Sequence, residues 1–404
     1  MQDNEKKPAL RFKGFTDPWE QRKLGEIAKE VVRNDPASDA PIMMITAGNG
    51  FIEQSDRYAF NNAGESLKKY ILLECGELAY NHGASKLRPY GSCFALTTVE
   101  KARIPFVYHC FSVEKSNPEF LSIELNGANV ENQLRKIVSS GARMDGLLNI
   151  AYSEYTEVTV QLPKKEEQDW IAKFFKQLDT LITLHQRKYE KLVNIKKSML
   201  DKMFPQNGAS VPEIRFKGFT DPWEQRKLKE LYFQLTERNA DLLPYQKTLS
   251  VATMSFKTDG NGAADTSLAN YKRLRTGDIA FEGHTSKEFR YGRFVLNDVG
   301  DGIMSPRFSA LRPLHEMPIN FWKYYIHYEP IMRKVLVNST KAGTMMNELV
   351  INEFLQESIL VPSVAEQQAI GRFFKQLDTL ITLHQRKLEK LQNIKKSCLE
   401  KMFV

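Results

Sequence analysis

Apolar residues recur every three or four positions along one long stretch, residues 166–203. No glycine or proline interrupts this stretch, which is rich in leucine, lysine, glutamate and glutamine, all good helix formers. Pro163 lies just upstream, where proline is compatible with a helix start. The pattern therefore predicts one continuous helix, about 57 Å long at a rise of about 1.5 Å per residue. Its narrow apolar seam favours pairing with a second helix.

The chain carries this stretch twice. Residues 174–188 are identical to residues 373–387, and only scattered positions differ from there to Phe204 and Phe403. Two interpretations stay open: two ordinary amphipathic helices of a domain core, or a pair, parallel or antiparallel, that the copies form with each other. Length, seam and duplication favour the pair. The predicted residues of the helix pair and of a partner interface are Phe174, Leu178, Leu181, Leu192, Ile195, Met199, Phe373, Leu377, Leu380, Leu391, Ile394 and Leu399.

A second repeat begins each half of the sequence. Residues 11–27 and 215–231 share the run Arg-Phe-Lys-Gly-Phe-Thr-Asp-Pro-Trp-Glu-Gln-Arg-Lys-Leu. Its Asp-Pro pair indicates a turn, and the pattern predicts a short helix at residues 19–24. Residues 205–212 have the proline, Asn-Gly and serine content of a linker. The repeats predict a first domain at 1–165, a helix at 166–204, a linker at 205–214, a second domain at 215–364 and a helix at 365–404.

The regions between these repeats differ in sequence but share a faint frame. Gly-(Glu/Asp)-x-Ala-aromatic occurs at residues 76–80 and 277–281, and Ser-Lys-x-x-x-Tyr-Gly follows at 85–91 and 286–292. The simplest account is one fold with two different surfaces. Short β-rich runs alternate with turns and some helix, including a helix at 321–337 that Pro330 should break. We therefore predict an α+β (α/β-like) protein of two domains related by a pseudo-twofold axis and separated by two long helices packed as a coiled coil.

Composition narrows the class of partner. The 404 residues carry a net charge of +8, which favours an acidic partner such as nucleic acid, although lysines on solvated helices give the same total. The four cysteines form no C-x-x-C pair, and histidine and cysteine do not cluster at metal-ligand spacing. No apolar run approaches the roughly 18 residues of a membrane span, and the first ten residues lack an apolar signal region. We expect reduced thiols, no metal site, no membrane contact and a cytoplasmic location.

Sequence signals for catalysis are missing. There is no G-x-x-x-x-G-K-(S/T) loop, and no G-x-G-x-x-G follows a predicted strand. The run Asn117-Pro118-Glu119-Phe120 approaches the (Asp/Asn)-Pro-Pro-aromatic motif of amine-directed base methyltransferases. It lacks the second proline, and no glycine-rich methyl-donor loop accompanies it, so a turn is the better interpretation. We predict a chain without catalytic residues.

The positive charge has a candidate site in two loops. Basic residues interleaved with an aromatic follow each Gly-(Glu/Asp)-x-Ala-aromatic run, a composition that suits phosphate contact and base-edge reading. The alternative for each single residue is a solvated surface charge. The candidate nucleic-acid contacts are Lys86, Arg88, Tyr90, Lys287, Arg290, Tyr291 and Arg293, with Arg103, Arg135, Arg143 and Arg307 elsewhere.

The doubled arrangement resembles the DNA-specificity subunit of type I restriction–modification systems. The resemblance rests on Pro-x-x-x-Glu-Gln-x-x-Ile at 163–171 and 362–370, on the long helices that follow, and on the repeats around Trp19 and Trp223. It covers the whole chain. It implies two target-recognition domains, each reading one half of a split DNA sequence, with the long helices between them as a spacer.

The resemblance also implies partners. These are double-stranded DNA, two copies of a methyltransferase subunit, and restriction–translocase subunits that can join. S-adenosylmethionine, ATP and Mg²⁺ would then belong to the partner subunits, and this chain would bind none of them. Near-identical helices beside divergent domains agree with a partner that binds twice and with two different DNA half-sites.

Two other functions compete with this one. A free-standing methyltransferase or nuclease would modify or cut DNA without a partner, and the missing motifs argue against it. A coiled-coil scaffold would bind proteins only, and would not bind DNA even with its partner present.

Overall fold

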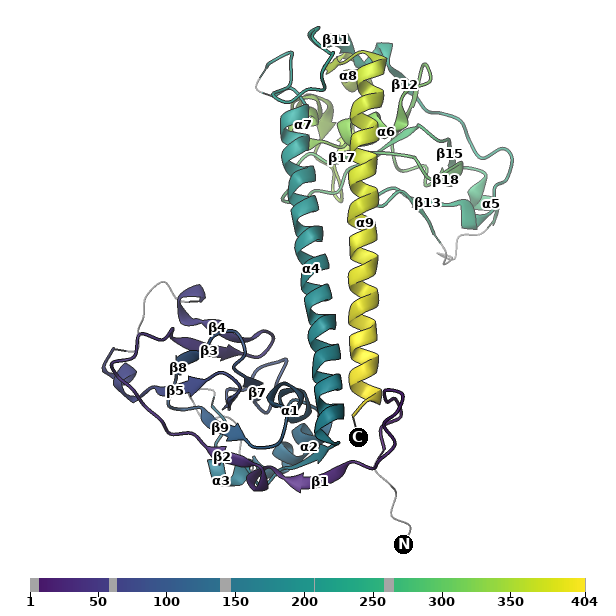
Figure 1. Cartoon of the computed structure of the whole chain (residues 1–404). Helices are drawn as coiled ribbons and strands as arrows, with labels where there is room; N and C mark the ends of the chain where they lie inside the picture. The colour runs from purple at the N-terminus through teal and green to yellow at the C-terminus, as the bar shows by residue number, and fades with distance from the viewer. Residues whose placement is uncertain (1–6, 58–63, 139–146, 207, 258–264, 404) are drawn as a thin grey trace. The chain divides into compact units, whose positions relative to one another are not determined.

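A computed structural model describes residues 7–57, 64–138, 147–206, 208–257 and 265–403 (Figure 1). The contacts within the chain divide it into two compact units. The first comprises Met1–Leu184 with Lys387–Val404, and the second comprises His185–Arg386. Each long helix therefore contributes one part to each unit. The segment boundaries drawn from the sequence follow the repeats rather than these contacts, and they stay a prediction.

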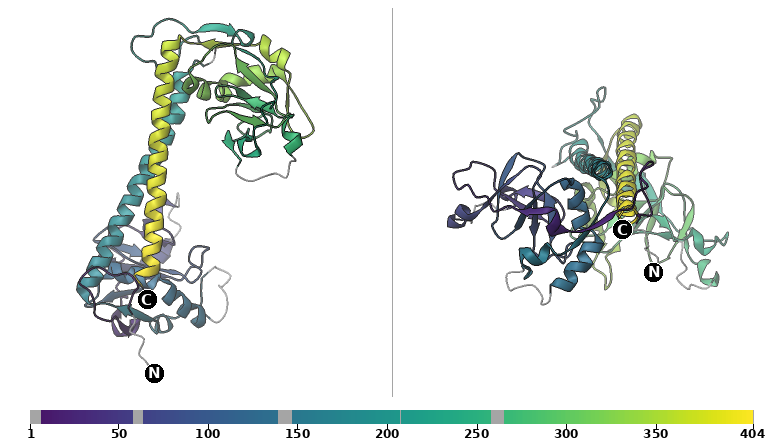
Figure 2. Two further views of the ribbon diagram at one scale, coloured as in Figure 1. Left: turned by 90° about the vertical axis from the view of Figure 1, so that its right-hand side faces the viewer. Right: turned by 60° about the horizontal axis from the view of Figure 1, so that its bottom comes forward.

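The two long helices are continuous. Helix α4 spans Lys165–Met203 and α9 spans Val364–Lys401, which confirms the helices predicted from the apolar spacing. Parts of α4 and α9 lie side by side within each unit (Figures 1 and 2). In the second unit His185 Nδ1 lies 2.8 Å from His384 Nδ1, and Lys196 pairs with Asp378 at 2.7 Å. A contact at a higher residue number on α4 thus has its partner at a lower residue number on α9, so this pairing is antiparallel.

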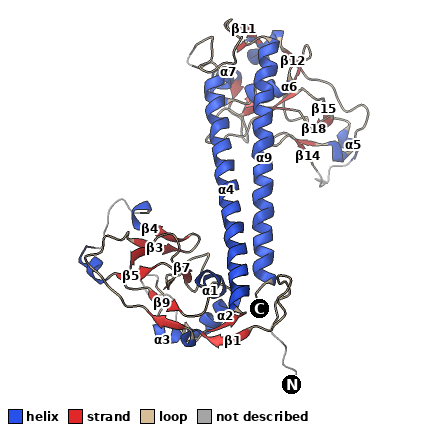
Figure 3. Cartoon of the chain, viewed as in Figure 1, coloured by secondary structure: helices blue, strands red, loops and turns tan. Residues whose placement is uncertain are grey.

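The first unit contains a four-stranded antiparallel sheet flanked by short helices (Figure 3). The sheet has the order β2-β9-β6-β7, and three two-stranded ladders, β1-β10, β3-β4 and β5-β8, accompany it. Its strands are β1 Glu20–Lys23, β2 Ala28–Glu30, β3 Met43–Thr46, β4 Gly50–Glu53, β5 Ile71–Glu74, β6 Leu78–Asn81, β7 Ser92–Ala95, β8 Lys101–Ile104, β9 His109–Val113 and β10 Thr159–Leu162. Its α-helices besides the long ones are α1 Pro118–Leu125, α2 Ala128–Ile137 and α3 Tyr152–Tyr155.

The second unit repeats this topology. Its four-stranded sheet has the order β12-β19-β16-β17, and the ladders β11-β22, β13-β14 and β15-β18 correspond to those of the first unit. An extra hairpin, β20-β21, has no counterpart among the described residues of the first unit. The strands are β11 Glu224–Lys227, β12 Tyr232–Gln234, β13 Leu249–Ser250, β14 Ser255–Phe256, β15 Lys272–Leu274, β16 Ile279–Glu282, β17 Arg293–Leu296, β18 Gly302–Met304, β19 Ala310–Pro313, β20 Thr340–Lys341, β21 Glu348–Leu349 and β22 Ser358–Val361. The helices are α5 Asp265–Leu268, α6 Ile319–Tyr325, α7 Glu329–Ser339 and α8 Ile351–Gln356.

The α+β class is confirmed, as is the helix break at Pro330, which lies in the first turn of α7.

The short helix predicted after each Asp-Pro turn is wrong. Residues 20–23 form strand β1, which pairs antiparallel with β10 directly before α4. Residues 224–227 form β11, which pairs in the same way with β22 directly before α9. The partner strand is more than 130 residues away in each case, so tertiary pairing overrides the local pattern. The repeat is thus a strand that anchors the start of a long helix.

Each unit has an aromatic core that the end of the other copy's helix completes. In the first unit Phe403, which follows α9, contacts Trp19, Phe120 and Phe175 at centroid distances of 5.7–6.0 Å. In the second unit the equivalent Phe204, which follows α4, is fully buried in the cluster around Trp223. Equivalent residues therefore close both cores.

A buried carboxyl gives the first unit a pH dependence. Burial raises the pKa of Glu124 on α1 to about 7, from an ordinary value of 4.5, although the Gln161 amide donates to it at 2.9 Å. The folded chain binds the Glu124 proton more tightly than the unfolded chain does. Protonation of Glu124 therefore stabilises the fold below about pH 4.5, and this stabilisation is lost as pH rises through about 7. Glu124→Gln should stabilise the chain by roughly 2–3 kcal/mol at pH 8.5 and much less at pH 5. Urea unfolding at both pH values measures this, and an equal effect at both would contradict it.

Candidate nucleic-acid interface

Two hairpin loops built on one turn carry the predicted DNA contacts. Residues 82–91 connect β6 to β7, and residues 283–292 connect β16 to β17. The amide of Ser85 donates to the carbonyl of Arg88 at 3.0 Å, and the amide of Ser286 donates to that of Phe289 at 3.1 Å. The shared sequence frame therefore corresponds to one loop conformation on two different domains.

A glycine closes each loop against the ring of the preceding strand. Gly91 has φ +81° and Gly292 has φ +83°, in the left-handed region that favours glycine. A Cβ at either position would lie 2.7 Å from a ring atom of Tyr80 or Phe281. The aromatic and Gly positions of the motif thus fit closely together in both loops, and the Ser hydroxyl of each loop accepts from a loop amide at 3.0 Å.

The candidate residues of the first loop differ in their surroundings: some bond within the protein and one faces solvent. Lys86 is exposed. Arg88 is half-buried and donates from Nη1 to the Asn126 carbonyl at 2.6 Å, and desolvation lowers its pKa. The Tyr90 carbonyl accepts from the Tyr80 hydroxyl at 2.7 Å. The Arg88 side chain and the Tyr90 backbone carbonyl therefore hold the loop in place.

The second loop presents more charge to solvent. Lys287 and Arg290 are exposed, and the Arg290 guanidinium lies 5.9 Å from the ring centroid of the partly buried Tyr291. Arg293 donates to the Ala252 carbonyl at 3.1 Å and stacks over Phe289 at 5.0 Å. The structure thus brings four candidates together here, two of them exposed cations.

The remaining candidates lie elsewhere in the two units. Arg103 is on β8, in another ladder from the first loop, and donates to the Ala40 carbonyl at 3.1 Å. Arg135 is exposed on α2, and Arg307 is exposed beside Phe308 at 5.4 Å. Arg143 lies outside the described residues. All of the DNA-contact assignments stay predictions.

Sequence reasoning missed the β20-β21 hairpin, which lies against the second loop. The Asn347 amide donates to the Gly283 carbonyl at 2.9 Å, and its side-chain Nδ2 donates to the Arg290 carbonyl at 3.3 Å. The run Ala342-Gly343-Thr344 is a turn signal that would have revealed the hairpin but not its place.

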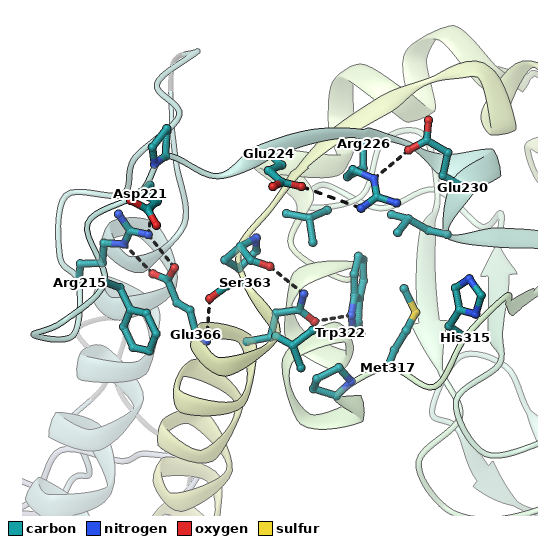
Figure 4. Close-up of a pocket in the computed structure, with 18 of the residues that line it drawn as sticks. Arg215, Asp221, Glu224, Arg226, Glu230, His315, Met317, Trp322, Ser363 and Glu366 are labelled. Carbon is teal, nitrogen blue, oxygen red and sulfur yellow. Dashed lines mark hydrogen bonds and ion pairs between the residues drawn. The ribbon is translucent and has the colours of Figure 1, made fainter.

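A cavity of about 400 Å³ in the second unit was also missed (Figure 4). Arg215 pairs with Glu366 on one side of it, and the Trp322 indole donates to Gln367 at 3.0 Å. Arg226 bonds Glu230 at 2.8 Å across the upper wall in this view. Both arginines that line this cavity are thus paired with carboxylates. Among the residues that the structure describes, no group of three or more His, Cys, Asp or Glu side chains is placed to hold a metal.

The apolar seam of the long helices is partly covered. Leu178 and Leu377 are buried, whereas Leu181 and Leu380 are each 43% exposed. Ile394 and Leu399 are also exposed. The other six predicted interface residues are partly buried against the cores: Phe174, Leu192, Ile195, Met199, Phe373 and Leu391. Leu184 and Leu383, which were not predicted, are each 44% exposed, so the same two leucines are uncovered in both copies.

Four lysines near the ends of the long helices differ in their contacts. Lys196 pairs with Asp378 at 2.7 Å, and the equivalent Lys395 pairs with Asp179 at 2.5 Å. Lys197 and Lys396 are exposed. The first two join α4 to α9 within each unit. None of the helices in the described ranges is long and apolar enough to cross a membrane.

Comparisons with known proteins agree with the two-unit organisation. A family model for the type I restriction modification DNA specificity domain matches residues 16–194 and again residues 221–393. The chain is 21% identical over 412 residues to the putative type I restriction enzyme MjaX specificity subunit of Methanocaldococcus jannaschii, covering 94% of this chain and 91% of that one. It is 23% identical over 282 residues to the MjaVIII specificity subunit of the same organism, covering 64% of each. The crystal structure of a type I restriction–modification S subunit from M. genitalium covers 98% of this chain and 99% of its own, at 14% identity and a TM-score of 0.56, a likeness of fold.

Proposed function

Because the chain belongs to the family of type I restriction–modification DNA-specificity subunits, we propose that it reads an asymmetric, two-part DNA target with one recognition domain in each unit. One observation carries the proposal. The loops 82–91 and 283–292 share a turn and a closing glycine, while the side chains that they expose differ. A shared frame with different exposed residues suits two domains that read different base sequences.

The proposal includes two copies of a methyltransferase subunit bound through the long helices. Support comes from the near-identity of α4 and α9, which offers one surface twice. Leu181 and Leu184 on α4, with Leu380 and Leu383 on α9, are exposed apolar residues that a partner would cover. Restriction–translocase subunits join this assembly in the cytoplasm.

The chemistry belongs to the partners in this proposal. S-adenosylmethionine, ATP and Mg²⁺ are held by the methyltransferase and restriction subunits, and this chain contributes no catalytic residue. The support is that its sequence lacks phosphate-binding and methyl-donor motifs. Purified chain that methylated or cut DNA without a partner would contradict this division.

Exchanging one variable region tests the two-part reading. Replacing residues 28–165 with the same region of another specificity subunit should change one half of the methylated sequence and leave the other half intact. The physical reason is that the two loops lie in different units, each with its own core. Methylome sequencing of cells that express the chain with its methyltransferase measures both halves at once.

The reciprocal exchange of residues 232–364 is the matched control, and it should change the other half only. A change of both halves in either exchange would contradict the modular reading. Methylated bases without any two-part sequence around them would contradict the proposed function itself.

A further inference from the structure

The β20-β21 hairpin presents an unusual side chain to solvent. Thr340 pairs with Leu349 and Lys341 with Glu348, and residues 342–347 form the turn. Met345 in this turn is 79% exposed, the largest fraction among the exposed large apolar side chains of the described residues. A methionine side chain is flexible and polarizable, so at this exposure Met345 is open to contact with a binding partner.

The hairpin is fixed to the loop 283–292 by its backbone. Asn347 donates from its amide to Gly283 and from its side chain to Arg290. A Cβ on Gly283 would lie 2.1 Å from the Asn347 carbonyl oxygen, so only glycine allows this approach. Met345 therefore stands at a defined place beside the basic loop.

The charges around this place favour an anionic partner. Lys341 on the hairpin and Lys287 and Arg290 on the loop are exposed cations. Glu288 and Glu348 are exposed acids on the same two segments, and His284 bonds the buried Glu282 at 2.5 Å. No distance below 4.0 Å joins either exposed acid to one of these three cations among the described ion pairs. The cations thus remain available for phosphates.

We propose that the β20-β21 hairpin is a base-reading element of the second unit, in which Met345 makes an apolar contact with a base edge of double-stranded DNA. Arg290 and Lys341 bind phosphates that flank this contact. An apolar side chain discriminates bases through contacts such as that with the thymine methyl group, and neighbouring cations fix its register. This inference rests on the proposed reading of DNA by each unit.

The test compares methylated sequences from complexes that differ at one residue. The full chain, wild type or Met345→Ala, is assembled with its methyltransferase and incubated with S-adenosylmethionine and a plasmid library of random inserts, and methylated bases are mapped by long-read sequencing. Met345→Ala should reduce the preference at one or two base pairs by about fivefold or more. Those base pairs should lie in the half-site that exchange of residues 232–364 changes, while the other half-site stays the same.

Two further variants distinguish a specific contact with a base from a general weakening of DNA binding. Leu242→Ala removes another apolar side chain of the second unit that is 65% exposed, and it should leave the methylated sequence unchanged. Arg290→Ala should weaken binding on all sequences and lower the salt dependence by about one counterion, without changing base preference.

The outcomes separate the inference from the function on which it rests. If the wild-type complex methylates no two-part sequence, both the proposed function and the inference are wrong. A two-part sequence that Met345→Ala leaves unchanged, or that Leu242→Ala alters equally, overturns the inference alone.

Discussion

Replacing Glu366 with alanine should lower the free energy of unfolding of the second unit by about 3–5 kcal/mol. Two nitrogens of Arg215, Nε and Nη2, each donate to one carboxylate oxygen of Glu366 at 2.7 Å. The Glu366 side chain is 1% exposed and that of Arg215 is 13% exposed. The hydrogen bonds with Glu366 raise the pKa of Arg215. Because a guanidinium also stays protonated without such a partner, the variant would leave a buried charge unpaired.

Amide hydrogen exchange of the full chain measures this effect unit by unit. The matched variant is Glu167→Ala, which removes the equivalent pair with Arg11 (2.6 and 2.9 Å) and should destabilise the first unit by a similar amount. Glu230→Ala is the control, because its pair with Arg226 is exposed and should contribute less than about 1 kcal/mol. Equal loss of protection in the Glu366 and Glu230 variants would show that burial of the pair does not matter.

Replacing Phe204 with alanine should cost the second unit about 3–5 kcal/mol through lost burial and the cavity that it leaves. The ring is fully buried and lies 5.2–6.4 Å from five other aromatic rings, four of them buried in the core, measured between centroids. Trp223 comes from the repeat after the linker, Phe321 and Tyr325 from α6, and Phe374 from α9. Its removal therefore loosens three segments at once.

Phe403→Ala is the matched variant in the first unit. Phe403 is only partly buried, so its removal should cost less than that of Phe204. Denaturant unfolding with hydrogen exchange as the readout compares the two. A larger loss for Phe403→Ala would contradict the link between burial and cost.

Features fixed by local pattern could be predicted from the sequence. The helices α4 and α9 follow from apolar spacing without glycine or proline, and the break before α7 follows from Pro330. The α+β class and the shared loop frame follow from repeated short motifs. These signals act over a few residues, which a sequence displays directly.

Features that depend on distant partners could not be predicted. Strand β1 pairs with residues about 140 positions away, and nothing within residues 19–24 reveals that partner. Arg88 looked like a free cation because the Asn126 carbonyl that it contacts is 38 residues away. The Arg11–Glu167 and Arg215–Glu366 pairs did leave a signal, since both of their residues recur in the repeats.

The helix end that completes each core has a consequence for ancestry. Residues 185–204 differ from residues 384–403 at four positions: Tyr189/Leu388, Val193/Gln392, Met199/Cys398 and Asp201/Glu400. The core of a half-length polypeptide with one domain and one such helix would therefore lack its closing phenylalanine. The helix of a second copy would supply that residue. The fold thus has the form of a domain-swapped homodimer joined into one chain, as tandem duplication of a single gene would produce, with two domains that differ and swapped helix ends that are nearly identical.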